Sequence, residues 1–514
     1  MPTPELLYPF LIAILPVVRT MARHPGQWSW SDAGLVLGAL FTGCTVLQVL
    51  LRLALRGRTA NRIPSPALMI AVIWFYSPRA FQQLEGSLGG SRGTLPILAV
   101  LVSAGLLLWL PQSPRVLDRV STFLTLTASF LVGWFTLQIV VNQVRAYYQV
   151  EHSALARELA IPVTIGRTSP TPPRRDIYLI VLDRYAHPTV LREHCGFSDP
   201  VFEDSLRALG FSLPRAVWSN YSGTSFSLPS LLNFRLVNSV AAEVGPRARD
   251  YTLPNHLLEY NRTVAFLKAQ GYRFLFLPSQ WWPSTRHNRN ADMELRVWRG
   301  LNLGRELSRS YLWRAWHEMT VLELLRRGYP SDVSYLEGTF AVLKETATAP
   351  GPKFVFAHVL SPHPPYVFTA SCGVLRPPAD GPATAERILY LDQIRCLNGL
   401  VLDFVTEVLR RSSVPPIILL QGDHGTGAME DSCANGVLPP DVAAKAALGA
   451  FGAYYLPAGG DRTLSDTVTL VNLFRSILIH YFGASLPFEA DGSYLQGSGP
   501  FVFKPVDSRW LHFP

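Results

Sequence analysis

Five apolar segments crowd the first 143 residues of the chain. A helix needs about 20 apolar residues to cross a bilayer, with about 17 as the lower limit. The second and fifth segments meet this length, whereas the other three do so only with flanking residues. We therefore predict an N-terminal α-helical membrane domain of about five spans; a buried helical core is the alternative. The segments are Leu6–Val18, Leu35–Leu55, Pro66–Tyr76, Leu95–Leu110 and Phe123–Val141.

The distribution of arginine predicts the orientation of these spans. Cytoplasmic loops of membrane proteins carry an excess of Lys and Arg. Two arginine clusters therefore place the N-terminus inside and everything after Val141 outside, although four other Arg fall in loops assigned to the outside. The formal charge is +9, but no basic stripe with interleaved aromatics occurs, so we expect no nucleic-acid partner. The clusters are Arg52, Arg56, Arg58 and Arg62, and Arg115 with Arg119.

The next stretch separates this anchor from an outer domain. Arg145–Ala160 has an amphipathic pattern and predicts a helix leaving the membrane. Thr168–Arg175 reads TSPTPPRR, and residues before proline are extended, so a linker is predicted here. We predict three parts: an anchor at residues 1–143, a juxtamembrane helix and linker at 144–175, and an outer domain at 176–514.

Two apolar runs of the outer domain end in side chains that bind metals. Asp176–Asp183 reads DIYLIVLD, and Ile417–Gly427 reads IILLQGDHGTG, with Asp423 and His424 at the strand end. Such runs are typical of central strands covered by helices, and alternating strands and helices predict an α/β domain with a mostly parallel sheet and helices on both faces. Ligands bind at the carboxyl ends of such strands, and these side chains suit Zn or Mn. A turn with a buried His and a helix-capping Asp are the alternatives.

A hydroxyl-rich loop supplies a candidate nucleophile. Ser219–Asn233 reads SNYSGTSFSLPSLLN and enters a helix-compatible segment. The start of a helix has free N–H groups that bind anions such as phosphate, and a divalent metal can activate a hydroxyl there. Thr224 is therefore the candidate nucleophile, and a capping residue without chemistry is the alternative.

These elements together resemble the sulfatase-like branch of the alkaline phosphatase superfamily. The resemblance rests on Asp183 after a strand, Thr224 in NYSGT and the late QGDHG, and covers about residues 176–486. A five-span anchor before such a domain is similar to lipoteichoic acid synthases and to lipid A phosphoethanolamine transferases. The resemblance implies an alkaline phosphatase-like fold and one divalent metal, Zn or Mn, with a second metal left open. Its ligands would be Asp183, Thr224, Asp423 and His424. In those transferases the first ligand is usually Glu, so Asp183 is a departure.

A sulfatase proper is disfavoured. Sulfatases convert a Cys or Ser within the motif C/S-x-P-x-R, and the nearest match, Ser227–Leu231, lacks the Arg. Thr224 cannot be converted in this way.

Two histidines follow a third strand-like run, Lys353–Phe368, which reads KFVFAHVLSPHPPYVF. In the resembled families a His before a Pro-Tyr element contacts the phosphoryl group or a second metal, and His363 in HPPY matches it. A His here can donate to charge developing on phosphorus or on the leaving oxygen. His358, near the strand end, is a candidate for the same roles, with a core histidine as the alternative.

Four cysteines of the outer domain permit two disulfides if that domain faces an oxidising compartment. Cys372 and Cys396 flank a loop of about two dozen residues, and Cys195 and Cys433 each follow a predicted metal-site strand. These two pairings are expected, and other pairings remain open.

The helical pattern of Tyr311–Arg327 is basic and rich in Trp and Leu. It predicts either an interfacial helix that dips toward lipid or an ordinary amphipathic helix packed on the outer domain.

The expected function is metal-dependent transfer of a phospholipid head group, phosphoethanolamine or phosphoglycerol. Thr224 would carry the group as a phospho-threonine and pass it to an envelope glycan or lipid. The expected location is a bacterial-type inner membrane, multi-pass, with the catalytic domain periplasmic. A membrane-anchored phosphodiesterase or phosphatase with the same site, and a non-enzymatic envelope protein, are the alternatives.

Overall fold

The structure is a computed structural model that describes residues 7–54, 63–77, 114–165, 174–279, 283–297, 310–325, 330–375, 383–427, 433 and 438–513. The fourth predicted apolar segment and most of the predicted linker lie outside these residues. The chain divides into two compact units. We call Met1–Tyr147 with Leu303–Arg326 the helical unit, and Tyr148–Asn302 with Arg327–Pro514 the sheet unit.

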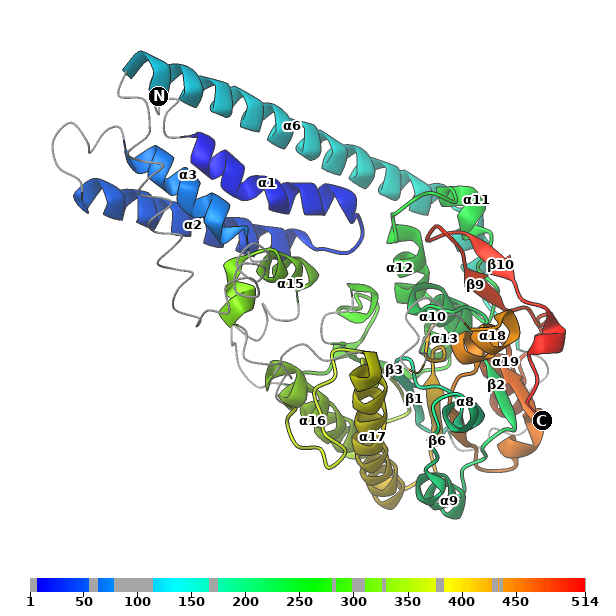
Figure 1. The fold of residues 1–514 in the computed structure, drawn as a ribbon. Coiled ribbons are helices and arrows are strands. Elements are labelled where there is room, and N and C mark those ends of the chain that lie inside the picture. The colour runs from blue at the N-terminus through cyan, green and yellow to red at the C-terminus, as the bar shows by residue number, and fades with distance from the viewer. Residues whose placement is uncertain are drawn as a thin grey trace. The chain divides into compact units, whose positions relative to one another are not determined.

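Within the described residues, the helical unit has four helices from the N-terminal part of the chain (Figure 1). They are α1 (Tyr8–Arg23), α2 (Trp30–Ala54), α3 (Pro64–Phe75) and α6 (Pro114–His152). Among the described residues only α2 and α6 are long and apolar enough to cross a membrane. The described residues therefore show two clear spans in place of about five, because α1 has 16 residues and α3 has 12, both short of a full span.

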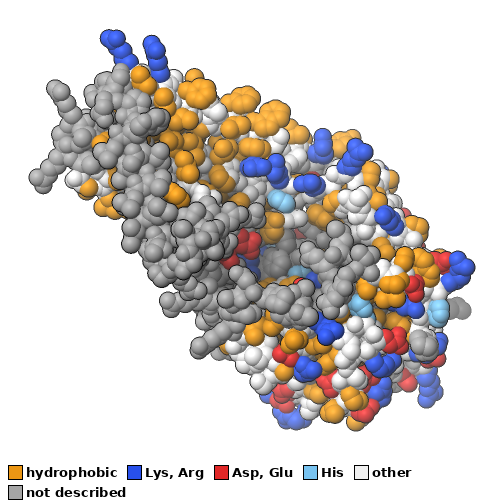
Figure 2. Space-filling view, in the orientation of Figure 1, with side chains coloured by type: hydrophobic (Ala, Val, Ile, Leu, Met, Phe, Trp, Pro, Cys, Tyr) orange, Lys and Arg blue, Asp and Glu red, His pale blue; other side chains and the backbone are white. Residues whose placement is uncertain are grey.

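The long helix α6 exposes apolar side chains along one stripe. Phe123, Leu126, Phe130, Trp134 and Leu137 recur at three- and four-residue steps, and each is about half exposed or more. Figure 2 shows hydrophobic side chains gathered over the N-terminal helices and charged ones interspersed over the sheet unit. An exposed apolar stripe of this kind fits a lipid environment.

The chain returns to the helical unit late in the sequence. Here α15 (Tyr311–Glu318) is followed by the 3-10 helix η4 (Val321–Leu325). Leu312 and Trp316 of α15 are buried in one cluster with residues of α1 and α2, and Trp316 Nε1 donates to Tyr76 OH at 3.2 Å. This amphipathic segment therefore packs on the N-terminal helices, an arrangement that neither sequence interpretation included.

The sheet unit is built on a six-stranded sheet in the order β4-β3-β5-β1-β6-β7. Every pairing is parallel except that of β7, which runs antiparallel to β6. The prediction of a mostly parallel sheet is therefore confirmed. The strands are β1 (Ile177–Leu182), β3 (Arg273–Leu277), β4 (Met293–Glu294), β5 (Lys353–Val359), β6 (Ile417–Gly422) and β7 (Gly452–Tyr455).

Helices cover both faces of this sheet. Alternate β1 residues enter two separate buried clusters, Tyr178, Ile180 and Leu182 in one and Ile177 and Leu179 in the other. The first cluster includes α8 (Pro188–Glu193), α9 (Pro200–Ala208), α16 (Pro330–Glu345) and α17 (Ala383–Arg411). The second includes α10 (Thr224–Asn233), α12 (Thr252–Glu259), α13 (Arg262–Ala269) and α19 (Leu470–Phe482).

Shorter elements complete the sheet unit. Two small sheets pair β2 (Ala216–Trp218) with β8 (Thr467–Thr469), and β9 (Tyr494–Gln496) with β10 (Phe503–Pro505). The other helices among the described residues are α7 (Ala154–Leu159), α11 (Val240–Val244), α18 (Pro440–Leu448), η3 (Pro283–Thr285), η5 (Thr346–Thr348), η6 (Gly460–Thr463) and η7 (Ser508–Trp510).

Candidate metal centre

Three neighbouring strands bring the predicted ligands to one edge of the sheet. β1 lies between β5 and β6, and all three run parallel, so their carboxyl ends lie at the same edge of the sheet. Asp183 follows β1, and Asp423 and His424 follow β6. The glycines of the GDHG motif permit this packing, because a Cβ at Gly425 would lie 2.0 Å from Ala446 O.

Four side chains converge at this edge. One ligand atom each of Asp183, Asp423 and His424 lie within 4.8 Å of one another. His424 Nε2 is 3.8 Å from Asp183 Oδ1, 3.5 Å from Asp423 Oδ2 and 3.5 Å from Thr224 Oγ1. All four residues are buried. The predicted ligand set is therefore assembled in space.

The imidazole of His424 presents a lone pair to these oxygens. His424 Nδ1 lies 3.0 Å from Gly425 O, and a carbonyl oxygen can only accept. Nδ1 therefore carries a proton, and Nε2 is the ring nitrogen that faces the oxygens of Asp183, Asp423 and Thr224. This arrangement is the one a metal-binding His adopts.

The hydrogen bonding of the buried carboxylate oxygens indicates whether a cation fits between these side chains. Asp183 Oδ1, Asp183 Oδ2 and Asp423 Oδ2 are buried and have no hydrogen-bond partner among the residues that the structure describes. Asp423 Oδ1 differs, since it accepts from the backbone N–H groups of Arg184 and His424 at 3.0 Å each. Uncompensated buried carboxylates are costly, so a divalent cation held by oxygen and nitrogen ligands fits this group.

The electrostatics keep Asp183 ionised. Burial by itself raises the pKa of this carboxyl, but the nearby imidazoles of His363, His358 and His424 outweigh it and hold the pKa well below its usual range. Asp183 is therefore an anion at neutral pH, as a metal ligand has to be.

Thr224 occupies the first position of α10, after the extended residue Gly223. The loop before it contacts the edge of the sheet that carries Asp183, Asp423 and His424, which we call the metal edge. The contact is a hydrogen bond from Ser219 Oγ to Asp423 O at 2.6 Å. The first N–H groups of a helix have no partner within the helix, so this end can bind an anion beside the Thr224 hydroxyl.

His363 lies next to the tip of β1. Its backbone N–H donates to Asp183 O at 3.1 Å, and its Nδ1 donates to Pro364 O at 2.5 Å. Burial lowers the pKa of this half-buried imidazole, so it is neutral near pH 7. The structure thus brings His363 to the site that the sequence predicted.

Two residues near the site were not singled out from the sequence. Arg184 has a left-handed backbone with φ of 62°, and its Nε donates to Thr426 O at 3.1 Å, which holds the loop after His424. Thr285 Oγ1 lies 2.7 Å from Nδ1 of His358, whose Nε2 lies 3.2 Å from Asp183 Oδ2. Nothing in the local sequence marks Thr285, whereas Arg184 directly follows a predicted ligand.

Both expected disulfides are present, between Cys195 and Cys433 and between Cys372 and Cys396. Cys44, in an apolar helix, is a free thiol.

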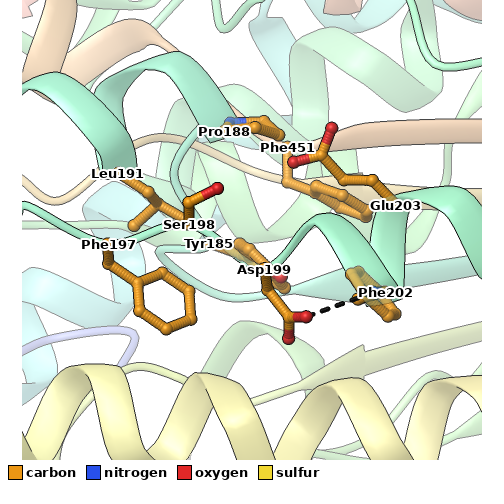
Figure 3. Close-up of a pocket in the computed structure, with 9 residues that line it drawn as sticks. All are labelled: Tyr185, Pro188, Leu191, Phe197, Ser198, Asp199, Phe202, Glu203 and Phe451. Atoms are coloured by element: carbon orange, nitrogen blue, oxygen red, sulfur yellow. Dashed lines mark hydrogen bonds between the residues drawn. The ribbon is translucent and has the colours of Figure 1, made fainter.

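A pocket elsewhere in the sheet unit is separate from the metal edge. Figure 3 shows its lining residues, among them Tyr185, Phe451 and the carboxylates of Asp199 and Glu203. Asp199 there caps α9 by accepting from Phe202 N at 3.1 Å, and Asn398 Nδ2 donates to Asp199 Oδ2 at 2.9 Å. Because none of the candidate metal ligands lines this pocket, the chemistry is assigned to the sheet edge.

Comparison with known proteins finds no matching family model and no matching curated protein. Solved structures do match. The C-terminal periplasmic domain of EptC from Escherichia coli, in complex with Zn, is 12% identical; the match covers 67% of this chain and 96% of that one, with a TM-score of 0.44. The integral membrane lipooligosaccharide phosphoethanolamine transferase EptA from Neisseria meningitidis is 12% identical, with 91% and 96% covered and a TM-score of 0.39.

A 2-O GAG sulfatase is 13% identical, with 62% of this chain and 72% of that one covered and a TM-score of 0.38. These structural neighbours are enzymes, and they include the phosphoethanolamine transferases and sulfatases that the sequence resembles.

Proposed function

We propose that this protein is a membrane-anchored, metal-dependent transferase that moves a phospholipid head group, phosphoethanolamine or phosphoglycerol, to an envelope glycan or lipid. One observation carries the proposal. Three buried carboxylate oxygens of Asp183 and Asp423 have no hydrogen-bond partner among the described residues. They belong to the same group of side chains as His424 and Thr224, and His424 Nε2 lies 3.5 Å from Thr224 Oγ1.

Asp183, Asp423, His424 and Thr224 would hold one divalent ion, Zn or Mn. When bound, such an ion lowers the pKa of a hydroxyl and neutralises charge on a phosphate group. Asp183 is poised for this role because it is anionic, and His424 because its Nε2 lone pair faces the shared space.

Thr224 would act as the nucleophile. Its Oγ forms a bond to the phosphorus of the head group, and the bond from phosphorus to the diacylglycerol oxygen breaks. His363 is neutral near pH 7, so it can take up the Thr224 proton and return it to the leaving oxygen. The head group is then carried on Thr224, and the hydroxyl of the acceptor displaces Thr224 by the same steps in reverse.

The amino end of α10 would bind the phosphoryl oxygens. Thr224 starts this ten-residue helix, so the N–H groups of its first turn lie beside the nucleophile. They favour negative charge through the helix dipole and cost no reorganisation during the reaction.

The anchor and the disulfides support a location at the outer face of a bacterial-type inner membrane. Two helices are long and apolar enough to span it, and both disulfides belong to the sheet unit. Disulfides persist in oxidising compartments such as the periplasm. A phospholipid donor and an envelope acceptor are both within reach of an enzyme held there.

Mass spectrometry of envelope lipids and glycans from cells with and without the gene tests this function. We expect the wild-type protein to add phosphoethanolamine or phosphoglycerol, and Thr224→Ala to abolish the addition. Ser225→Ala removes a neighbouring hydroxyl that is not a candidate ligand and should leave it intact. Unchanged fractions would remove the transferase proposal, and release of the head group into water by the purified protein would favour a hydrolase.

A further inference from the structure

The two carboxylates at the metal edge are held in different ways. Asp423 is fixed by two backbone N–H groups that donate to its Oδ1. Asp183 receives no hydrogen bond on either oxygen from the residues that the structure describes. Metal-binding carboxylates need such partners to keep their orientation. Another group therefore has to orient Asp183.

His358 stands where such a group is required. It is the penultimate residue of β5 and pairs in register with Val181 of β1, so its side chain reaches the tip of the neighbouring strand. Its Nε2 lies 3.2 Å from Asp183 Oδ2, and both side chains are fully buried. This distance is within hydrogen-bonding range, and neither atom has another partner among the described residues.

The far side of the His358 ring is fixed by a buried hydroxyl pair. His358 Nδ1 lies 2.7 Å from Thr285 Oγ1, and Thr285 Oγ1 donates to Ser279 Oγ at 2.9 Å. Ser279 and Thr285 are also joined by a backbone hydrogen bond from Ser279 N to Thr285 O at 2.8 Å. The Thr285 hydroxyl can rotate, and when it donates to His358 Nδ1 instead, the proton of a neutral ring is on Nε2, where it can donate to Asp183 Oδ2.

The geometry separates His358 from the ligands themselves. Asp183 uses Oδ1 toward His424 and Oδ2 toward His358. The group whose ligand atoms all lie within 4.8 Å of one another contains Asp183, Asp423 and His424 but not His358. His358 therefore contacts Asp183 from outside this group of candidate ligands.

We propose that His358 is a positioning residue that orients the Asp183 carboxylate for metal binding, and that Thr285 fixes its imidazole for this task. The inference rests on the proposed metal-dependent function. It gives His358 a place outside the metal's coordination shell and away from the phosphoryl group. Loss of an outer-shell partner typically weakens metal affinity about 10- to 100-fold.

The test measures Zn and Mn affinity of the full-length protein in detergent by competition with a chromophoric chelator. His358→Phe should weaken binding about 10- to 100-fold. Thr285→Val should weaken it by a smaller factor, and Thr285→Ser, which keeps the hydroxyl, should restore the wild-type value. His480→Gln, an exposed histidine on α19, is the control and should change nothing. Circular dichroism checks that each variant is folded.

X-ray absorption of the Zn-loaded protein gives an independent count of imidazole ligands. We expect one, from His424, in both wild type and His358→Phe; two in the wild type would make His358 a ligand and overturn the proposal. Wild-type affinity in folded His358→Phe would overturn it too, even if activity were lost. A wild-type protein that binds neither metal would instead defeat the proposed function, so the two failures are distinguishable.

Discussion

Thr224 Oγ1 and His424 Nε2 lie 3.5 Å apart, although 200 positions separate the two residues in the sequence. Two loops create this contact, one before α10 and one after β6, and they are joined by the hydrogen bond from Ser219 Oγ to Asp423 O. The Thr224 hydroxyl is thus held against the loop that carries two of the candidate ligands.

Replacement of Asp183 by Asn should affect the metal-free and metal-loaded proteins in opposite directions. Without metal, neither oxygen of this buried carboxylate has a hydrogen-bond partner among the described residues, and burial in that state is costly. We expect metal-free Asp183→Asn to be more stable than metal-free wild type by about 1–3 kcal/mol. With Zn or Mn present the wild type should be the more stable, and transfer activity should fall at least about 100-fold in the variant.

Thermal unfolding with and without a chelator measures this reversal. Wild type should lose thermal stability when the chelator is added, whereas Asp183→Asn should change little. If chelation leaves the wild-type curve unchanged, no stabilising metal is bound.

Arg184 has a strained backbone, and its side chain holds the loop after His424 through a hydrogen bond. Its φ of 62° costs about 1–2 kcal/mol for a non-glycine residue, and its guanidinium donates to Thr426 O. Arg184→Ala and Arg184→Gly both remove the hydrogen bond to Thr426 O, but only glycine relieves the backbone strain. We expect both variants to lose activity, with Arg184→Gly about 1 kcal/mol more stable than Arg184→Ala in denaturant titrations. Equal stability of the two would show that the backbone is not strained there.

The loop before Thr224 depends on the C-terminal segment. Buried Asn220 donates from Nδ2 to Gly492 O at 2.7 Å and accepts at Oδ1 from Val471 N at 2.8 Å. Asn220→Ala leaves one buried and one half-buried backbone group without their partners and should cost about 2–3 kcal/mol in free energy of unfolding. Ser222→Ala removes one half-buried acceptor of Gln496 N and should cost less than about 1 kcal/mol. A similar cost for both would argue against this account.

Acid should destabilise the sheet unit through His187. Burial lowers the pKa of this histidine from 6.5 to about 4 in the folded protein. Above pH 6.5 the ring is neutral in both folded and unfolded states, so it has no effect on stability. As the pH falls from 6.5 to 4 the unfolded state takes up the proton first, and stability declines by up to about 3 kcal/mol.

Equilibrium unfolding between pH 4 and pH 7 checks this decline. His187→Gln, which has no titrating group, should flatten the curve in that window. An unchanged slope in the variant would assign the acid sensitivity to other groups.

Apolar patterns predicted the central strands well because each is a continuous buried run. The predictions at 176–183 and 417–422 correspond to β1 and β6, and the ligands at their ends are brought together by parallel pairing. Thr285 could not be found in this way, because its contact with His358 depends on loop packing between positions 73 residues apart. The helical segments at 6–18 and 66–76 were identified, but their lengths were overestimated as spans because apolar composition does not give helix length.

The return of α15 to the helical unit bears on how the sheet unit can be produced by itself. A protein beginning near residue 148 would still contain Leu312 and Trp316, whose buried contacts come from α1 and α2. Removing the N-terminal helices would expose these side chains to water and favour aggregation. A soluble form of the sheet unit would therefore need the stretch around residues 303–326 replaced by a polar connection, in addition to truncation at the N-terminus.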